Sequence, residues 1–217
     1  EFDVTGNKQL GLDFIEAEKN AVLKSDFRIA VSNKLVEYWK EEFGYKQSNY
    51  VVIPCTLTSQ AASSLPDKRE VETIKLVYSG GTGPWQSFTL VTKLIRAKLK
   101  SDSTISVLFL TKENELIDDL IKEFPDRCER KWLKHDEVFE ALSNCDYGIL
   151  IRNQNVTNQV ASPVKFAEYL NAGLKVLVSE NLGDFTEFVR KHDCGEVVFD
   201  QIKELKRIEG FESNRVI

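Results

Sequence analysis

Short runs of β-branched and apolar residues alternate with longer amphipathic runs along almost the whole chain. Such alternation indicates a parallel β-sheet whose strands are joined by helices that cover its faces. Two series of this kind are separated by residues 56–70, which are rich in Ser, Gln, Ala, Pro and charges and have no clear period, as is typical of a linker. We therefore expect an α/β chain with a Rossmann-like doubly wound parallel sheet and a fragment of a second Rossmann-like domain.

The two series set the expected domain limits. Residues 1–56 are the end of a first domain, residues 57–73 the interdomain linker and residues 74–217 the main domain. The tail after Asp200 is expected to begin one more helix. Six strands are predicted in the main domain, at residues 74–78, 105–110, 130–133, 147–151, 176–179 and 196–199.

Composition excludes several classes of protein. The 217 residues, 42% hydrophobic and 29% charged, are ordinary for a folded domain and argue against disorder. The net charge of -5 argues against a nucleic-acid or anionic-membrane surface over the whole molecule. No apolar run approaches the roughly 20 residues of a membrane span, and no secretory signal opens the chain. Because the chain begins at Glu1 and contains no Met, we expect a piece of a longer protein.

The four cysteines lie far apart and form no C-x-x-C pair. Three of them sit in or beside apolar runs, so buried thiols in a reducing cytoplasm are favoured over disulfides. No His, Cys and Asp residues have metal-ligand spacing, and no metal is expected.

Ligands of doubly wound sheets bind where the carboxyl ends of the strands open into loops. Three segments at these ends have unusual composition: the Gly-rich turn at residues 79–84, the Asn-rich loop at residues 153–158 and the turn at residues 180–183.

The most informative segment follows the Asn-rich loop. Ser162 is a suitable N-cap, Pro163 suits the first helical position and Gly173 suits the C′ position, so a helix of about ten residues is predicted. At about 100° per residue, the face expected to pack on the sheet holds Pro163, Phe166, Ala167 and Leu170.

Lys165 and Glu168 fall on the opposite face of this helix and are expected to point toward the crevice. A cation in the first turn is disfavoured by the helix dipole, by about 0.3–1 kcal/mol. Its placement there is explained if an anion such as phosphate binds at the helix N-terminus. The alternative is a solvated Lys–Glu pair on an exposed helix face, and these residues alone do not choose between the two.

Residues 162–179, S-P-V-K-F-A-E-Y-L-N-A-G-L-K-V-L-V-S, resemble a segment of the C-terminal domain of family-four glycosyltransferases with the GT-B fold. Three further matches occur in the expected order: I-A-V-S at residues 29–32 followed by V-V-I-P at 51–54, L-V-Y-S-G-G at 76–81, and F-E-A-L-S-N-C-D-Y-G-I-L within residues 138–150. The resemblance thus covers nearly the whole chain and makes residues 1–56 the end of the N-terminal, acceptor-binding domain.

The resemblance implies roles for particular residues. Glu168 matches the second Glu of a pair that brackets the family's donor site and would bind the ribose hydroxyls, whereas the first Glu falls at Val160 and is missing. The donor-binding set would be Gly80, Gly81, Arg152, Asn158, Ser162, Pro163, Val164, Lys165 and Glu168, with Lys165 and Glu168 as the catalytic pair.

Residues 82–87 lack the Arg and Lys with which many relatives hold the diphosphate, and Gln86 stands near the expected Lys. Either Lys165 and Arg152 supply that charge, or the activity is weak or lost. Asn158 and its neighbours either bind sugar hydroxyls or simply form turns.

The implied activity is transfer of a sugar, with retention, from a UDP- or GDP-sugar to a hydroxyl of a saccharide or lipid-linked acceptor in cell-surface polysaccharide synthesis. It needs no cofactor or metal, and no nucleic acid is expected as a partner. The protein is expected in the cytoplasm, peripheral at the membrane through the missing domain, and this piece alone is expected to be inactive. Two alternatives stay open: a catalytically degenerate module that binds a nucleotide or a protein, and a GT-B sugar-nucleotide epimerase.

Overall fold

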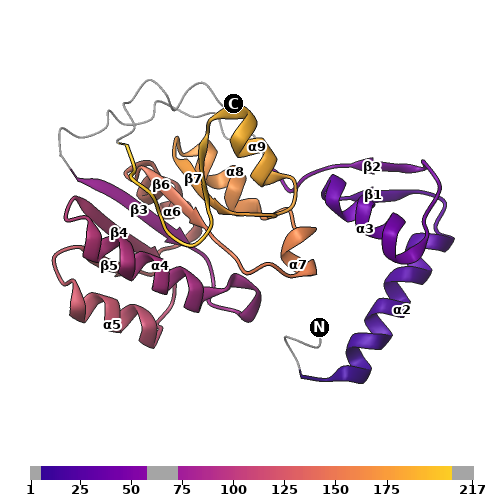
Figure 1. Ribbon diagram of the computed structural model, residues 1–217, viewed down its shortest axis with the longest axis horizontal. Coiled ribbons are helices and arrows are strands. Elements are labelled where there is room, and N and C mark those ends of the chain that lie inside the picture. Colours follow the sequence, from indigo (N-terminus) through magenta and orange to yellow (C-terminus); the bar gives the residue numbers. More distant parts are fainter. Residues whose placement is uncertain (1–5, 58–72, 207–217) are drawn as a thin grey trace.

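The computed structural model describes residues 6–57 and 73–206, which form two parallel sheets (Figure 1). The larger sheet has six strands in the order β5-β4-β3-β6-β7-β8. Counted along this sheet's own chain the order is 3-2-1-4-5-6, the order of dinucleotide-binding Rossmann domains. Its strands are β3 (Ile74–Ser79), β4 (Ile105–Leu110), β5 (Cys128–Lys131), β6 (Tyr147–Leu150), β7 (Lys175–Ser179) and β8 (Gly195–Val198).

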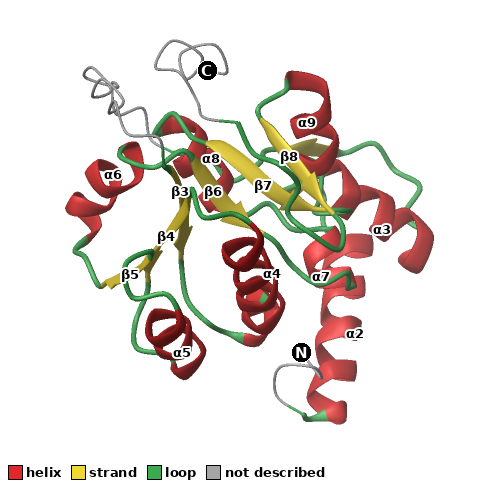
Figure 2. Cartoon of the chain, turned by 60° about the vertical axis from the view of Figure 1, so that its left-hand side comes forward, coloured by secondary structure: helices red, strands yellow, loops and turns green. Residues whose placement is uncertain are grey.

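Helices cover both faces of this sheet (Figure 2). One face packs against α4 (Phe88–Ser101) and α5 (Glu115–Glu123), and its core includes Leu76, Ile95 and Phe109. The other face packs against α6 (His135–Ser143), α8 (Val164–Asn171) and α9 (Phe185–His192). Because both faces are covered, the central strands are apolar almost throughout rather than alternating.

The N-terminal part has a small core of its own. Strands β1 (Arg28–Ala30) and β2 (Tyr50–Val52) pair in parallel and pack with α2 (Lys8–Lys24) and α3 (Asn33–Phe43). Helix α3 starts at the N-cap Ser32, whose hydroxyl accepts the Leu35 N–H at 3.0 Å, and it ends at Gly44 in the left-handed conformation at φ 67°. The core cluster of this part consists of Val22, Ala30, Val36, Trp39, Phe43 and Tyr45.

The predicted fold class and the six strands of the main domain are confirmed. The strand predicted at residues 130–133 lies two residues earlier, at Cys128–Lys131, because it is a mostly polar edge strand whose only buried side chain is Cys128. The short helices η1 (Pro84–Gln86) and α7 (Val156–Gln159) were not predicted. Most of the predicted linker lies outside the described residues. Residues 201–206 contain no helix, and the tail beyond them is also outside.

The helix that carries the candidate site begins one residue later than predicted. Pro163 is the N-cap of α8 and Gly173, at φ 76°, follows its C-cap as expected. Ser162 is therefore not the cap: its hydroxyl accepts the backbone N–H of Cys55 at 2.9 Å. This contact joins the start of α8 to the chain that follows β2.

Three of the four cysteines are buried free thiols, as the sequence predicts. Cys128, Cys145 and Cys194 are buried, Cys55 is exposed, and no disulfide joins any of them. Within the described ranges no helix is long and apolar enough to cross a membrane.

Candidate nucleotide-binding site

The candidate site lies where neighbouring strands β3 and β6 lead to opposite faces of the sheet. The chain after β3 continues to α4 on one face, and the chain after β6 continues to α8 on the other. In doubly wound sheets this divergence opens a crevice at the carboxyl ends of the two strands. The Gly-rich turn follows β3 and Arg152 follows β6, so the predicted residues Gly80, Gly81 and Arg152 come to the same end of the sheet.

The Gly-rich turn leaves open space beside it. Gly80 has a φ of +151°, a region that residues with side chains rarely adopt, and its N–H is bonded to the Leu110 carbonyl at 3.2 Å. A Cβ built on Gly81 would meet no atom within 4 Å. The Tyr78 hydroxyl donates to the Gly81 carbonyl at 2.5 Å and holds the turn. Burial raises the pKa of Tyr78 to about 12, so this hydroxyl keeps its proton at neutral pH.

Arg152 is a buried cation with incomplete partners. Its side chain is 9% exposed, and its two terminal nitrogens donate to Asn158 Oδ1 at 3.3 Å and to Gln86 Oε1 at 3.0 Å. Its Nε is buried and has no partner, and no carboxylate of the described chain pairs with the guanidinium. Burial lowers the pKa of Arg152, as expected for a charge that lacks a counter-ion.

Asn158 holds Arg152 and shapes the loop after β6. It is 2% exposed, and its Nδ2 donates to the Asn153 carbonyl at 3.0 Å while its Oδ1 accepts from Arg152. Asn155 caps α7 by accepting the Asn158 N–H at 2.9 Å. These asparagines therefore build the loop, and the predicted contact of Asn158 with a sugar stays a prediction.

Lys165 and Glu168 form an ion pair on α8. Lys165 Nζ lies 2.6 Å from Glu168 Oε2, with 28% and 19% of the two side chains exposed. The two residues are partly buried, and an ion pair between them was expected under the alternative interpretation, so the anion-binding role of Lys165 stays a prediction. Pro163 offers no side-chain cap to the first turn, so the N–H groups at the start of α8 gain no bond from it. Val164 is the first helical residue.

Tyr169 was missed by the sequence interpretation. It is fully buried, and its hydroxyl accepts the Ser79 N–H at 2.9 Å and donates to the Ile149 carbonyl at 3.4 Å. Its ring lies on Gly148, where a Cβ would come within 2.3 Å of the ring carbons. Tyr169 thus ties α8 to the ends of both strands that bound the crevice. The spacing Phe166–Tyr169 on one helix face was the available signal, whereas Ala167 and Leu170 prove only partly buried.

The third predicted segment, residues 180–183, lies against the chain between α7 and α8. Gly183 is left-handed at φ 50°, and a Cβ there would come within 2.1 Å of the Ala161 carbonyl oxygen. Only glycine permits this approach, which places the turn after β7 beside the start of α8.

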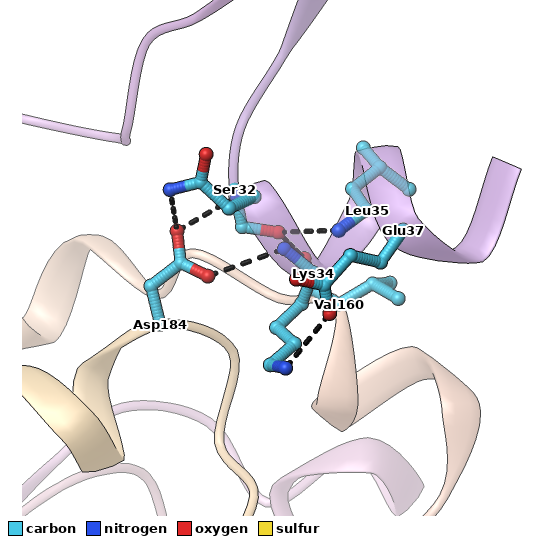
Figure 3. Close-up of polar contacts among 7 residues, drawn as sticks. Ser32, Lys34, Leu35, Glu37, Val160 and Asp184 are labelled. Atoms are coloured by element: carbon cyan, nitrogen blue, oxygen red, sulfur yellow. Dashed lines mark hydrogen bonds and ion pairs between the residues drawn. The ribbon is translucent and has the colours of Figure 1, made fainter. Parts of the chain in front are cut away.

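The N-terminal part contacts the same region (Figure 3). The Asp184 carboxylate accepts the backbone N–H groups of Asn33 at 2.7 Å and Lys34 at 3.2 Å, at the positive end of α3. The Ser32 hydroxyl donates to the Val160 carbonyl at 2.7 Å. Val160 stands where the family pattern has its first Glu, and here its backbone is an anchor for the N-terminal part.

The described ranges hold no group of three His, Cys, Asp or Glu side chains placed to bind a metal ion. No protein-family model matches the chain, and no curated protein matches it.

Solved structures do match. The glycosyltransferase WaaG, involved in lipopolysaccharide biosynthesis, aligns with a TM-score of 0.64 at 13% identity over 93% of this chain and 56% of its own. A sucrose-phosphate synthase from Thermosynechococcus elongatus aligns with a TM-score of 0.62 at 15% identity, over 93% and 52%. A glycosyltransferase from Rickettsia africae aligns with a TM-score of 0.59 at 15% identity, over 86% and 52%.

The fold is that of a Rossmann-like domain of the GT-B fold with part of a second domain. The chain spans about half the length of these structures, 52–56%, and the six-stranded sheet is a Rossmann-like domain of that fold. At this level of identity the likeness establishes the fold and leaves the narrower assignment to family four as a prediction.

Proposed function

We propose that this chain is the nucleotide-sugar-binding part of a retaining glycosyltransferase, which moves a sugar from a nucleoside diphosphate to a hydroxyl acceptor. The observation that carries the proposal is Arg152, a buried cation with no carboxylate partner and one unpaired N–H, at the end of the sheet where ligands of this fold bind. A buried charge is stable only when it is paired and hydrogen-bonded. A diphosphate in the crevice would supply the negative charge, and a shift of the guanidinium toward it would give the Nε–H its missing acceptor.

The position of Arg152 also accounts for the missing basic residues of the Gly-rich turn. Gln86 stands near the expected Lys, and its Oε1 accepts from the Arg152 guanidinium. Gln86, which stands near the position of the expected Lys, thus holds the Arg152 guanidinium beside the Gly-rich turn. This supports the interpretation that Arg152, with Lys165, supplies the charge for the diphosphate, over the interpretation that the activity is lost.

Lys165 can serve the diphosphate without leaving Glu168. An ammonium has three donors and the bond to Glu168 uses one of them. Together with the uncapped N–H groups at the start of α8, the remaining donors favour an anion at this helix end. Glu168 keeps its second carboxylate oxygen for the ribose hydroxyls that the family resemblance assigns to it.

In the proposed reaction the bond between the anomeric carbon and the diphosphate oxygen breaks, and its electron pair stays with the diphosphate. The acceptor oxygen bonds to the same face of the anomeric carbon, and its proton passes to a phosphate oxygen. Arg152, Lys165 and the backbone N–H groups stabilise the negative charge that grows on the leaving group. The place of WaaG in lipopolysaccharide biosynthesis supports an acceptor in cell-surface polysaccharide synthesis.

Calorimetric titration of UDP and GDP into this chain tests the proposal. A solved structure of the related fold, the pneumococcal O-GlcNAc transferase GtfA, was obtained with UDP and GlcNAc, so UDP is the first choice. We expect one nucleotide to bind in the micromolar-to-millimolar range. Lys165→Ala and Glu168→Ala should each weaken it at least tenfold, about 1.4 kcal/mol.

The matched control is Glu187→Ala, which removes an exposed ion pair with Arg190 on α9 and should change affinity less than twofold. Absence of binding of either nucleotide to the folded chain would contradict the proposal, as would equal losses in the control.

A further inference from the structure

The two halves of the six-stranded sheet separate at the seam between β3 and β6. Within these described strands the pairing covers two positions, the last of them Val77 with Gly148. Each strand stays longer with its outer neighbour, since β3 pairs with β4 as far as Ser79 and β6 pairs with β7 as far as Leu150. The separation is therefore local to the seam at whose end the candidate site lies.

The directions of the backbone groups identify the next hydrogen bond that this seam would make. The Gly80 N–H points to β4, where it donates to the Leu110 carbonyl at 3.2 Å. Backbone groups of successive residues alternate between the two sides of a strand, so the Ser79 N–H points to β6. The Asp146 carbonyl accepts the first backbone N–H of β7, so the Ile149 carbonyl, three residues later, points to β3. In a continuous ladder of this register, the Ser79 N–H would donate to the Ile149 carbonyl.

The Tyr169 hydroxyl stands between these two groups. It accepts the Ser79 N–H at 2.9 Å and donates to the Ile149 carbonyl at 3.4 Å. Two such bonds meeting at one hydroxyl oxygen place the backbone N and O atoms about 5 Å apart, where a direct bond would hold them at about 2.9 Å. Burial raises the pKa of Tyr169 well above its ordinary value, so the hydroxyl keeps its proton and can serve both strands.

The ring of Tyr169 reaches the seam from α8 because the facing residue of β6 is a glycine. A Cβ at Gly148 would lie 2.3 Å from the ring carbons, so any larger residue there would push the ring away. The hydroxyl and the glycine are thus two parts of one arrangement, in which a side chain of α8 replaces a hydrogen bond of the sheet.

The groups that we assign to the diphosphate lie directly beyond this point. Ser79 leads into the Gly80–Gly81 turn, and Ile149 stands three residues before Arg152. A direct bond between the two strands would bring their ends about 2 Å closer together and narrow the space between the turn and the guanidinium.

We propose that Tyr169 is a positioning residue of the nucleotide site, whose hydroxyl holds the ends of β3 and β6 apart so that a diphosphate fits between the Gly-rich turn and Arg152. The inference rests on the proposed function and deepens it by naming the residue that sets the width of the site. Tyr169 is fully buried and acts through the two strands, without touching the nucleotide.

Tyr169→Phe tests this role, because it removes the hydroxyl and keeps the ring on Gly148. The Ser79 N–H and the Ile149 carbonyl can then pair only by closing the seam. We expect calorimetric titration to show that UDP or GDP, whichever binds the parent chain, binds at least fivefold more weakly to the variant. In NMR of the nucleotide-free chains labelled with ¹⁵N-arginine, the Arg152 Nε–H signal should be displaced, which a loss of stability alone would not cause.

Tyr147→Phe is the matched control. Tyr147 is also buried, at 3% exposed, and its hydroxyl also donates to a backbone carbonyl, that of Lys206 at 2.7 Å. Tyr147→Phe should change nucleotide affinity less than twofold and leave the Arg152 signal in place. Replacement of Tyr169 by para-aminophenylalanine, which keeps a hydrogen-bonding group at the position of the hydroxyl, should restore affinity to within threefold of the parent chain.

The outcomes separate this inference from the proposed function. Equal nucleotide affinity of the parent chain and folded Tyr169→Phe would overturn the inference and leave the proposed function standing, as would an equal loss in Tyr147→Phe. A parent chain that binds neither nucleotide would refute the proposed function and with it the role of Tyr169. If Tyr169→Phe fails to fold, Gly148→Ala takes its place, because the added Cβ displaces the ring and its hydroxyl; unchanged affinity in that variant would overturn the inference.

Discussion

Replacing Arg152 by Met should separate stability from ligand binding. The substitution removes a buried charge without a counter-ion and an unpaired Nε–H, and an unmade buried hydrogen bond costs about 1–3 kcal/mol. It also removes two hydrogen bonds, to Asn158 and Gln86, each worth about 0.5–1.5 kcal/mol, and leaves the buried Asn158 Oδ1 unpaired, at about 1–3 kcal/mol. The losses together are about 2–6 kcal/mol, which exceeds the gain of about 1–3 kcal/mol.

The remaining term is the desolvation of the guanidinium, which is several kcal/mol for a buried ion in a protein. We therefore expect the free energy of unfolding of Arg152→Met to equal that of the parent chain or exceed it by up to about 2 kcal/mol. Nucleotide affinity should fall at least tenfold, because the diphosphate loses its buried counter-ion. Urea denaturation followed by circular dichroism measures the first quantity, and calorimetric titration of UDP and GDP measures the second.

Arg28 provides a matched control. It is also buried, at 6% exposed, and has one unpaired terminal nitrogen, but its Nε donates to the Val22 carbonyl at 2.5 Å and its guanidinium lies 5.0 Å from the centre of the Tyr45 ring. Arg28→Met should lower the free energy of unfolding by about 1–3 kcal/mol and leave nucleotide affinity unchanged. A loss of more than about 3 kcal/mol in the free energy of unfolding of Arg152→Met, together with unchanged nucleotide affinity, would show that Arg152 has a structural role and does not bind the nucleotide.

Three further predictions concern other parts of the chain. Gly148→Ala should lower the free energy of unfolding by about 1–3 kcal/mol, because the added Cβ would lie 2.3 Å from the Tyr169 ring. Urea denaturation measures this, and an unchanged free energy of unfolding would show that α8 can move away from the sheet at no cost. Asp184→Ala should speed amide hydrogen exchange in the first turn of α3, at a cost of about 0.5–2 kcal/mol, because two backbone N–H groups lose their acceptor; unchanged exchange would contradict this. Burial raises the pKa of Cys128 from 9.0 to about 11, so its contribution to stability is complete below pH 9 and is lost as the pH rises through 11. The loss is at most about 3 kcal/mol, and Cys128→Ala should remove it from the pH dependence of urea denaturation. An equal pH dependence in the variant would contradict this.

Much of the candidate site could be predicted because it depends on local pattern and on a general rule of parallel sheets. The Gly-rich turn and Arg152 lie about 70 residues apart, yet both follow apolar strands, and the carboxyl ends of parallel strands meet at one edge of the sheet. Gly173 was placed correctly because a left-handed residue after a helix strongly favours glycine.

What was missed depends on contacts between distant segments. Ser162 is a residue type that favours the N-cap position. Its hydroxyl instead accepts the backbone N–H of Cys55, 107 positions away in the sequence. Tyr169 lies on the buried face of α8 because Gly148 leaves room for its ring. This contact joins two distant segments, and neither residue predicts it from its own local sequence. Helix α7 has four residues, too few to show a period, so its region was predicted as a loop.

We propose that the guanidinium of Arg152, with its unpaired Nε–H, lies at a site for a nucleoside diphosphate. Two-dimensional NMR of the chain labelled with ¹⁵N-arginine resolves the side-chain Nε–H signals. The signal that is absent from the spectrum of Arg152→Met is that of the Arg152 Nε–H. On titration with UDP or GDP, the Arg152 signal should move and sharpen as its Nε–H gains an acceptor, while the Arg28 signal stays in place. An Arg152 signal that stays unchanged at a nucleotide concentration that saturates the calorimetric titration would place the nucleotide elsewhere and contradict a diphosphate site at Arg152.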